Sequence, residues 1–160
     1  MTAYLAAAIA LLGASIAWGQ WHTARQKLIL DLFEKRLTII EVVWDAWREF
    51  NEALNSSFSE FDEAAWHSRL QVQRRRAVLL FGDEYEKLIS RFIYQTSLIR
   101  SDLSERGYDT DDASEEAARA ERLERRKWFY RFPDELYSAA IPYVKMDQKL
   151  PVHLSFLTDE

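Results

Sequence analysis

Few residues in this chain have the type and spacing that catalysis or metal binding requires. The three histidines, His22, His67 and His153, are far apart, and none belongs to an H-E-x-x-H-like arrangement. The absence of cysteine excludes disulfides, thiol nucleophiles and cysteine-based metal sites. No glycine-rich phosphate loop or serine nucleophile elbow is present. The sequence therefore predicts a protein that is not an enzyme, with no cofactor, no metal and no small-molecule substrate.

The densest group of carboxylates lies in a polar segment and at the start of the helix expected after it. Its members are Asp109, Asp111, Asp112, Glu115 and Glu116. Oxygen-rich loops can hold Ca²⁺, but this one lacks the spacing and the sharp-turn glycine of a calcium loop. Acidic side chains complement the dipole at a helix N-terminus, which is the simpler explanation of the cluster.

Basic residues form no continuous basic face. The net charge is −5, and Arg74, Arg75 and Arg76 are consecutive on an expected helix, so their side chains point about 100° apart. A solvated helix surface is the simplest interpretation, with contact to anionic lipid or an acidic partner as the alternative. Nucleic acid is not an expected partner.

The clearest functional signal is the N-terminal segment, in which no charged side chain occurs before Arg25. The mostly apolar stretch from Ala3 to Trp21 would extend roughly 28 Å as a helix, close to the thickness of a bilayer's hydrocarbon core. Tyr4 lies near one end, and Trp18 and Trp21 lie near the other, as in an interfacial aromatic belt. The segment therefore predicts a single transmembrane helix.

Two alternatives stay open for residues 1–22. A cleaved signal peptide would normally have a positive charge before its apolar region, which this segment lacks apart from its terminus, although Ser15-Ile16-Ala17 is a tolerable cleavage site. A buried helix of a soluble protein is the second alternative, because the stretch is alanine-rich and only moderately hydrophobic. We expect the membrane anchor.

The charges that follow the segment predict its orientation. Arg25, Lys27, Lys35 and Arg36 outnumber the acids near them, and the positive-inside rule then places the C-terminal domain in the cytoplasm and the N-terminus outside. The residues expected at the membrane interface are Tyr4, Trp18, Trp21, Arg25, Lys27, Lys35 and Arg36.

Hydrophobic spacing beyond the anchor predicts helices only. Neither glycine nor proline occurs between Gly19 and Gly82, which favours long helices. The first helix is expected over Gln20 to Leu54. Its apolar stripe is Leu30, Phe33, Leu37, Ile40, Trp44, Trp47 and Leu54, with Ile29, Val43 and Phe50 on one flank.

Caps and turn residues predict where the later helices begin and end. Ser57, Ser59 and Asp62 are alternative N-caps for a second helix that ends at Gly82, where Asp83 can cap the third, about 84–103. A fourth helix is expected over 113–132, and Pro133 is expected to begin a short fifth helix that reaches about Pro142. The exposed patch, if there is one, is expected within residues 127–132, although Trp128 and Phe132 suit a core.

These assignments together predict an all-α protein. A transmembrane anchor over residues 1–22 continues into a cytoplasmic bundle of about four to five helices over residues 23–147, followed by an irregular tail over residues 148–160.

The juxtamembrane segment resembles that of a family of small, uncharacterised bacterial single-pass membrane proteins. The run ARQKLILDLFEKRL, residues 24–37, is similar to the family's R-x-K-L-x-L-D-L-F-x-x-R pattern. Two further patches, residues 79–84 and 142–144, resemble other segments of the same family. Ile40 departs from the tyrosine expected there. The resemblance implies anchoring in a bacterial inner membrane and implies no chemistry.

The function expected from the sequence is that of a membrane-anchored, non-enzymatic interaction or scaffold module. Its expected partners are the lipid bilayer and either another copy of the chain or another membrane protein. The alternatives are an accessory subunit of a larger membrane complex and an exported soluble helical protein released by signal cleavage.

Overall fold

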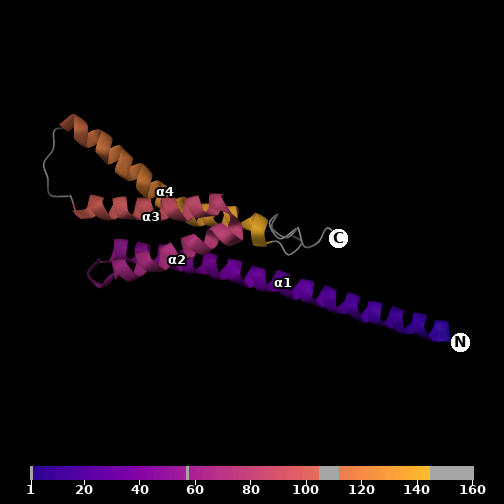
Figure 1. Ribbon diagram of the computed structural model, residues 1–160. Coiled ribbons are helices and arrows are strands. Elements are labelled where there is room, and N and C mark those ends of the chain that lie inside the picture. Colours follow the sequence, from indigo (N-terminus) through magenta and orange to yellow (C-terminus); the bar gives the residue numbers. More distant parts are fainter. Residues whose placement is uncertain (1, 57, 105–111, 145–160) are drawn as a thin grey trace. The chain divides into compact units, whose positions relative to one another are not determined.

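The computed structural model describes residues 2–56, 58–104 and 112–144, and within these ranges the chain is helical with no strand (Figure 1). Its elements are α1 (Thr2–Asn55), a short 3₁₀ helix η1 (Phe58–Glu60), α2 (Glu63–Phe81), α3 (Asp83–Ser104) and α4 (Asp112–Val144). The prediction of an all-α fold is confirmed. The tail predicted over residues 148–160 lies outside the described residues.

The chain divides into two units, which are described separately. Residues 36–145 form a compact helical bundle, and the N-terminal residues up to Lys35 belong to the other unit. In the described part of the chain, no helix contains a stretch that is long and apolar enough to cross a membrane. The transmembrane part of the fold prediction is therefore not confirmed.

The second half of α1 is a principal element of the bundle, but its buried face differs from the predicted stripe. Leu30 and Leu37 are exposed, whereas Val43 and Phe50, predicted on the flank, are fully buried. Ala46 is fully buried on this face, and the Trp66 indole N–H donates to the Ala46 carbonyl at 2.8 Å.

The ends of α2 follow from local backbone chemistry. Asp62 is its N-cap, and the carboxylate accepts a hydrogen bond from the Ala65 backbone N–H at 2.9 Å. Gly82 ends it with φ of 86° and ψ of −177°, a conformation that only glycine adopts easily. Asp83 begins α3 directly, inside its first turn, where a carboxylate complements the helix dipole.

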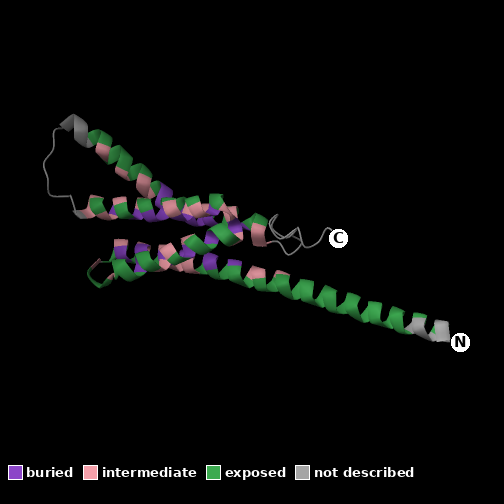
Figure 2. Ribbon diagram, in the orientation of Figure 1, coloured by how far each residue is buried: buried purple, intermediate pink, exposed green. Residues whose placement is uncertain are grey.

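Buried residues of α1, α2, α3 and α4, purple in Figure 2, form one core cluster, and many of them are aromatic. Phe92 stacks on Phe132 with ring centroids 4.1 Å apart, and Phe50 packs edge-on or tilted against Phe58, Phe61 and Trp66. Trp128 and Phe132 are buried, as the sequence suggested. Such rings bury large apolar areas and fix the spacing of the helices.

The predicted break at Pro133 is wrong, because α4 runs through Pro133 and Pro142 to Val144. A proline inside a helix has no N–H to donate, so the carbonyl four residues earlier, that of Phe129, loses its helical partner. The indole N–H of Trp47 on α1 donates to that carbonyl at 3.0 Å. A side chain from another helix thus supplies the hydrogen bond that the proline removes.

We predict that Trp47 and Pro133 are energetically coupled. Replacing Trp47 with Phe leaves the Phe129 carbonyl without its donor and should lower the free energy of unfolding by about 1–3 kcal/mol. Pro133→Ala restores a backbone donor, so Trp47→Phe should cost less in that background. Chemical denaturation of the four proteins of this cycle measures the coupling.

Trp44→Phe is the matched control, because Trp44 is also half-buried and stacks on Trp47. The decrease in the free energy of unfolding caused by Trp44→Phe should be the same whether residue 133 is proline or alanine. Equal costs of Trp47→Phe in the two backgrounds would refute the coupling.

Candidate functional surfaces

The N-terminal part of α1 carries the aromatic residues predicted at a membrane interface. Tyr4 is 84% exposed and Trp18 is 70% exposed, and Trp21 is also exposed. Trp18 and Trp21 lie one turn apart with ring centroids at 5.6 Å, and the Arg25 guanidinium lies over the Trp21 ring at 5.6 Å. These three residues form one aromatic and cationic cluster near the end of the uncharged segment.

Apolar side chains in this segment face outward in every direction. Every residue from Ile9 to Leu28 is exposed (Figure 2). The large apolar residues among them include Ile9, Leu11, Leu12, Ile16 and Leu28. These side chains expose apolar surface to water, which is unfavourable.

The basic residues predicted at the interface divide into two groups. Lys27 and Lys35 are exposed, as is Arg25. Arg36 is only 7% exposed and belongs to the bundle. The four therefore do not form one interfacial set.

Arg36 holds the C-terminal ends of two helices. Its Nε donates to the Leu80 carbonyl at 3.0 Å, and its Nη1 donates to the Tyr143 carbonyl at 2.8 Å. Leu80 lies in the last turn of α2 and Tyr143 in the last turn of α4, where carbonyls have no helical donor and carry the negative end of the helix dipole.

Burial lowers the pKa of Arg36, but the guanidinium titrates so far above neutrality that it stays charged. The Tyr143 ring lies 5.7 Å from its central carbon and covers it further. The interfacial role predicted for Arg36 is therefore corrected to a structural one, in which a buried charge is satisfied by helix-end carbonyls.

A groove of about 550 Å³ lies between the end of α1 and the start of α2. Its walls carry Glu49, Glu52, Glu60 and Asp62, and its floor includes Phe61 and Trp66. Arg69 already occupies part of it, because its guanidinium pairs with the Glu49 carboxylate, and Asp62 is engaged as the N-cap of α2. No group of three or more metal-ligating side chains occurs among the described residues.

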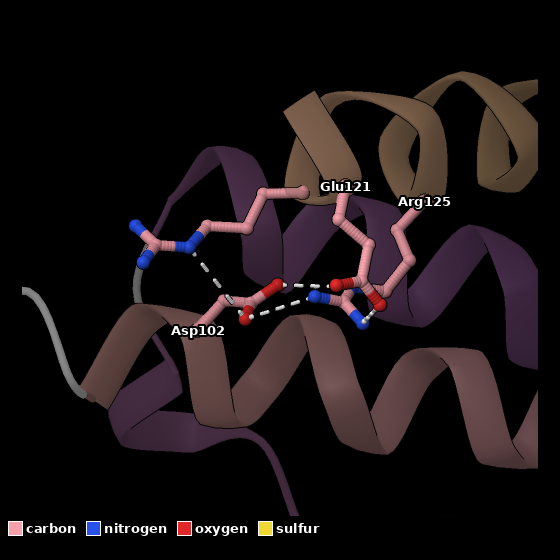
Figure 3. A network of polar contacts seen from close by, with 4 residues as sticks. Asp102, Glu121 and Arg125 are labelled. Carbon is pink, nitrogen blue, oxygen red and sulfur yellow. Dashed lines mark hydrogen bonds and ion pairs between the residues drawn. The ribbon is translucent and has the colours of Figure 1, made fainter. Parts of the chain in front are cut away.

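Figure 3 shows a charge network that joins α3 to α4. Asp102 on α3 pairs with Arg125 at 3.2 Å and with Arg122 at 3.9 Å, and Arg125 also pairs with Glu121 at 3.1 Å. Asp102 and Arg125 are mostly buried. Each ion pair of the network joins opposite charges, and those of Asp102 hold α3 against α4. The carboxylates of Asp102 and Glu121 are both paired with arginine.

Tyr85 is a buried titratable group of the bundle. Burial raises its pKa, and its hydroxyl has no hydrogen-bond partner among the described residues. It stacks on Phe81 at 4.1 Å and lines a groove of about 510 Å³ that also includes Glu135 and Ser138. A phenol held neutral in this way packs as an aromatic ring and is not a general base.

The remaining candidates from the sequence are scattered. His22 and His67 are exposed, and His22 contacts only the amide of Gln26, at 3.1 Å, on its own helix. His153 and the acidic residues Asp109 and Asp111 lie outside the described residues.

An exposed row along α4 includes Tyr130, which lies in the segment 127–132 where the sequence placed a possible patch, but the rest of the row was not predicted. Leu123, Tyr130 and Tyr137 recur every seven residues and are all exposed. The spacing is readable in the sequence, but it does not distinguish an exposed row from a buried one until the direction of the core is known.

No protein-family profile, no curated protein and no solved structure matches this chain. The resemblance to a bacterial membrane-protein family is carried by the residues quoted above and stays a prediction.

We predict that Arg36 is far more important for stability than its neighbour Lys35. Arg36→Met leaves the carbonyls of Leu80 and Tyr143 without their charged donor and should lower the free energy of unfolding by about 2–3 kcal/mol. Lys35→Met is the control and should change stability by less than about 0.5 kcal/mol, because Lys35 is exposed. Equal effects in chemical denaturation would contradict the structural role of Arg36.

Proposed function

We propose that the chain is a membrane-tethered, non-enzymatic helical interaction module. Residues 2–21 insert into a lipid bilayer and hold the bundle of residues 36–145 at its surface. The observation that carries the proposal is the N-terminal part of α1, which is uncharged before Arg25 and exposes its apolar side chains on all sides.

Transfer free energies support a lipid partner for this helix. Burying one large aliphatic side chain contributes roughly 1.5–3 kcal/mol, and Ile9, Leu11, Leu12 and Ile16 are all exposed. Trp18 and Trp21 followed by Arg25 and Lys27 have the order of an interfacial anchor, with amphipathic rings at the headgroups and cations beyond them.

The basic residues beyond the segment support an orientation. Arg25, Lys27 and Lys35 are exposed and follow the uncharged segment in the sequence, before the bundle begins. Positive charges favour the cytoplasmic side of a membrane. The proposal therefore places the bundle in the cytoplasm and the N-terminus outside. The resemblance to bacterial single-pass proteins favours the inner membrane as the location.

The bundle supports an interaction role through its surface. Exposed aromatic and aliphatic side chains lie on α4, including Tyr130, Tyr137 and Ile141. Large apolar residues gathered on one helix face favour a protein partner over a purely solvated role. A tether raises the local concentration of any partner in the same membrane.

Membrane extraction with two matched substitutions tests the tether. The full-length chain made in bacterial cells should stay with the membrane pellet after a carbonate wash. Leu12→Lys places a charge near the middle of the segment at a cost of about 2.5–3.5 kcal/mol, so at least roughly ten-fold more protein should be released. Leu79→Lys, at another strongly exposed leucine but on α2, should release none.

Complete release of the native chain would refute the tether. Release of a chain whose measured mass shows that the residues up to Ala17 have been removed would support the exported soluble alternative. Equal release of the two lysine variants would show that retention depends on the bundle and not on residues 2–21.

A further inference from the structure

A third groove, of about 330 Å³, lies between α3 and α4 and is called here the α3–α4 groove. Its volume is that of a site for a small molecule. Charged side chains line much of it, and Figure 3 shows two of them, Glu121 and Arg125. The others are Arg91, Arg131 and Glu124.

Ion pairs already engage the carboxylates of the groove wall and the mostly buried Asp102 behind it. The pairs are Asp102 with Arg122 and Arg125, Glu121 with Arg125, and Glu124 with Lys127. Three carboxylates and three cations therefore neutralise one another.

Arg91 and Arg131 are the cations that this balance leaves over. Both are exposed and line the groove, and neither forms an ion pair with a carboxylate in the described part of the chain. Glu135, one turn beyond Arg131, lines a different groove and accepts a hydrogen bond from the Trp128 indole N–H at 3.1 Å. The α3–α4 groove thus has two positive charges in excess, although the net charge of the chain is −5.

Contacts with one turn of α4 hold both guanidiniums at the groove. The central carbon of the Arg91 guanidinium lies 4.7 Å from the centroid of the buried Trp128 ring. The Nε of Arg131 donates to the carbonyl of Lys127 at 3.4 Å, which leaves its Nη donors for a ligand. A guanidinium held against an aromatic face keeps its donors in one plane, so less side-chain entropy is lost when a ligand binds.

We propose that the α3–α4 groove binds the phosphate group of a small phosphomonoester. Such a group carries about 1.5–2 negative charges at pH 7 and three acceptor oxygens, which match the two charges in excess. The Arg91 and Arg131 guanidiniums can each donate two parallel hydrogen bonds, and the exposed Tyr94 hydroxyl is a further donor in the groove. A carboxylate has one charge and two oxygens, so it would leave part of these donors unused.

Acceptors beside the guanidiniums indicate hydroxyl groups on the rest of the ligand. Gln95 lines the groove, and its Oε1 is buried without a donor among the residues that the structure describes. A ligand hydroxyl supplies the donor that this oxygen lacks. The ligand class is therefore a short phosphorylated polyol such as glycerol phosphate, either free in solution or as the headgroup of a lipid.

Binding at this groove is independent of the membrane tether, because every residue of the groove lies within the bundle. A chain that binds glycerol phosphate but washes off membranes would refute the tether alone. A chain that stays in the membrane but binds no phosphomonoester would refute the groove alone.

Isothermal titration calorimetry of the full-length chain in a nonionic detergent tests the site. Glycerol phosphate should bind with one molecule per chain, and glycerol, which lacks the phosphate, should give no binding heat. Acetate should bind at least about ten-fold more weakly than glycerol phosphate, because it presents one charge and two oxygens.

Two double variants separate this site from general attraction between an anion and arginine. Arg91→Gln/Arg131→Gln should raise the dissociation constant of glycerol phosphate at least about ten-fold. Arg75→Gln/Arg76→Gln removes the same charge from two exposed arginines on α2 and should change it by less than about two-fold. Tyr94→Phe, which removes only a hydroxyl, should raise it about two-fold or more. Circular dichroism should show that all three variants remain folded.

A lipid arm of the experiment distinguishes the two sources of the phosphate. The chain in phosphatidylcholine vesicles should bind glycerol phosphate as it does in detergent. Adding phosphatidylglycerol phosphate, whose headgroup ends in the same phosphomonoester, abolishes this binding if the lipid is the source and leaves it unchanged if the free ligand is. No binding of glycerol phosphate by the native chain, equal effects of the two double variants, or acetate binding as tight as that of glycerol phosphate would each overturn the proposal.

Discussion

The fold depends on a buried positive charge held between two helix ends. Arg36 donates to the carbonyls of Leu80 and Tyr143, in the last turns of α2 and α4, and among the α1 residues whose burial is described it is the first buried one. A guanidinium can satisfy separate carbonyls with fixed geometry because its donors lie in one rigid plane. Three helices are thereby joined at the end of the bundle where the buried part of α1 begins.

Further along α1, a second polar contact keeps α4 continuous. The Trp47 indole donates to the Phe129 carbonyl, which Pro133 leaves without a helical donor. Phe129 itself stacks against Trp47 with ring centroids 5.7 Å apart. Packing and hydrogen bonding therefore act at the same place, and together they hold α4 against α1.

The sequence predicted those features that local physics determines. Patterns a few residues long predict the end of α2 at Gly82 and place Asp62 among its candidate caps. The same kind of pattern predicts the inward side chains of Trp66, Leu70 and Phe92. The long unbroken helix of α1 follows from the lack of glycine and proline after Gly19.

The errors have one physical origin, which is a partner far away in the sequence. The local sequence predicts Arg36 at a membrane interface, because its carbonyl partners are 44 and 107 residues away. It predicts a helix start at Pro133, because the donor that compensates for the proline is on α1. The exposed positions of Leu123 and Tyr137 are not predicted for the same reason, since exposure depends on where the other helices lie.

The central claim is that the exposed apolar part of α1 belongs in lipid, and quenching of tryptophan fluorescence by brominated phospholipids tests it most directly. Trp18 and Trp21 are two of six tryptophans, and the other four lie in the bundle. In vesicles, brominated lipid should reduce the emission of the native chain, and the Trp18→Phe/Trp21→Phe variant should lose that reduction. Unchanged emission of the native chain, or equal quenching of the variant, would contradict the claim.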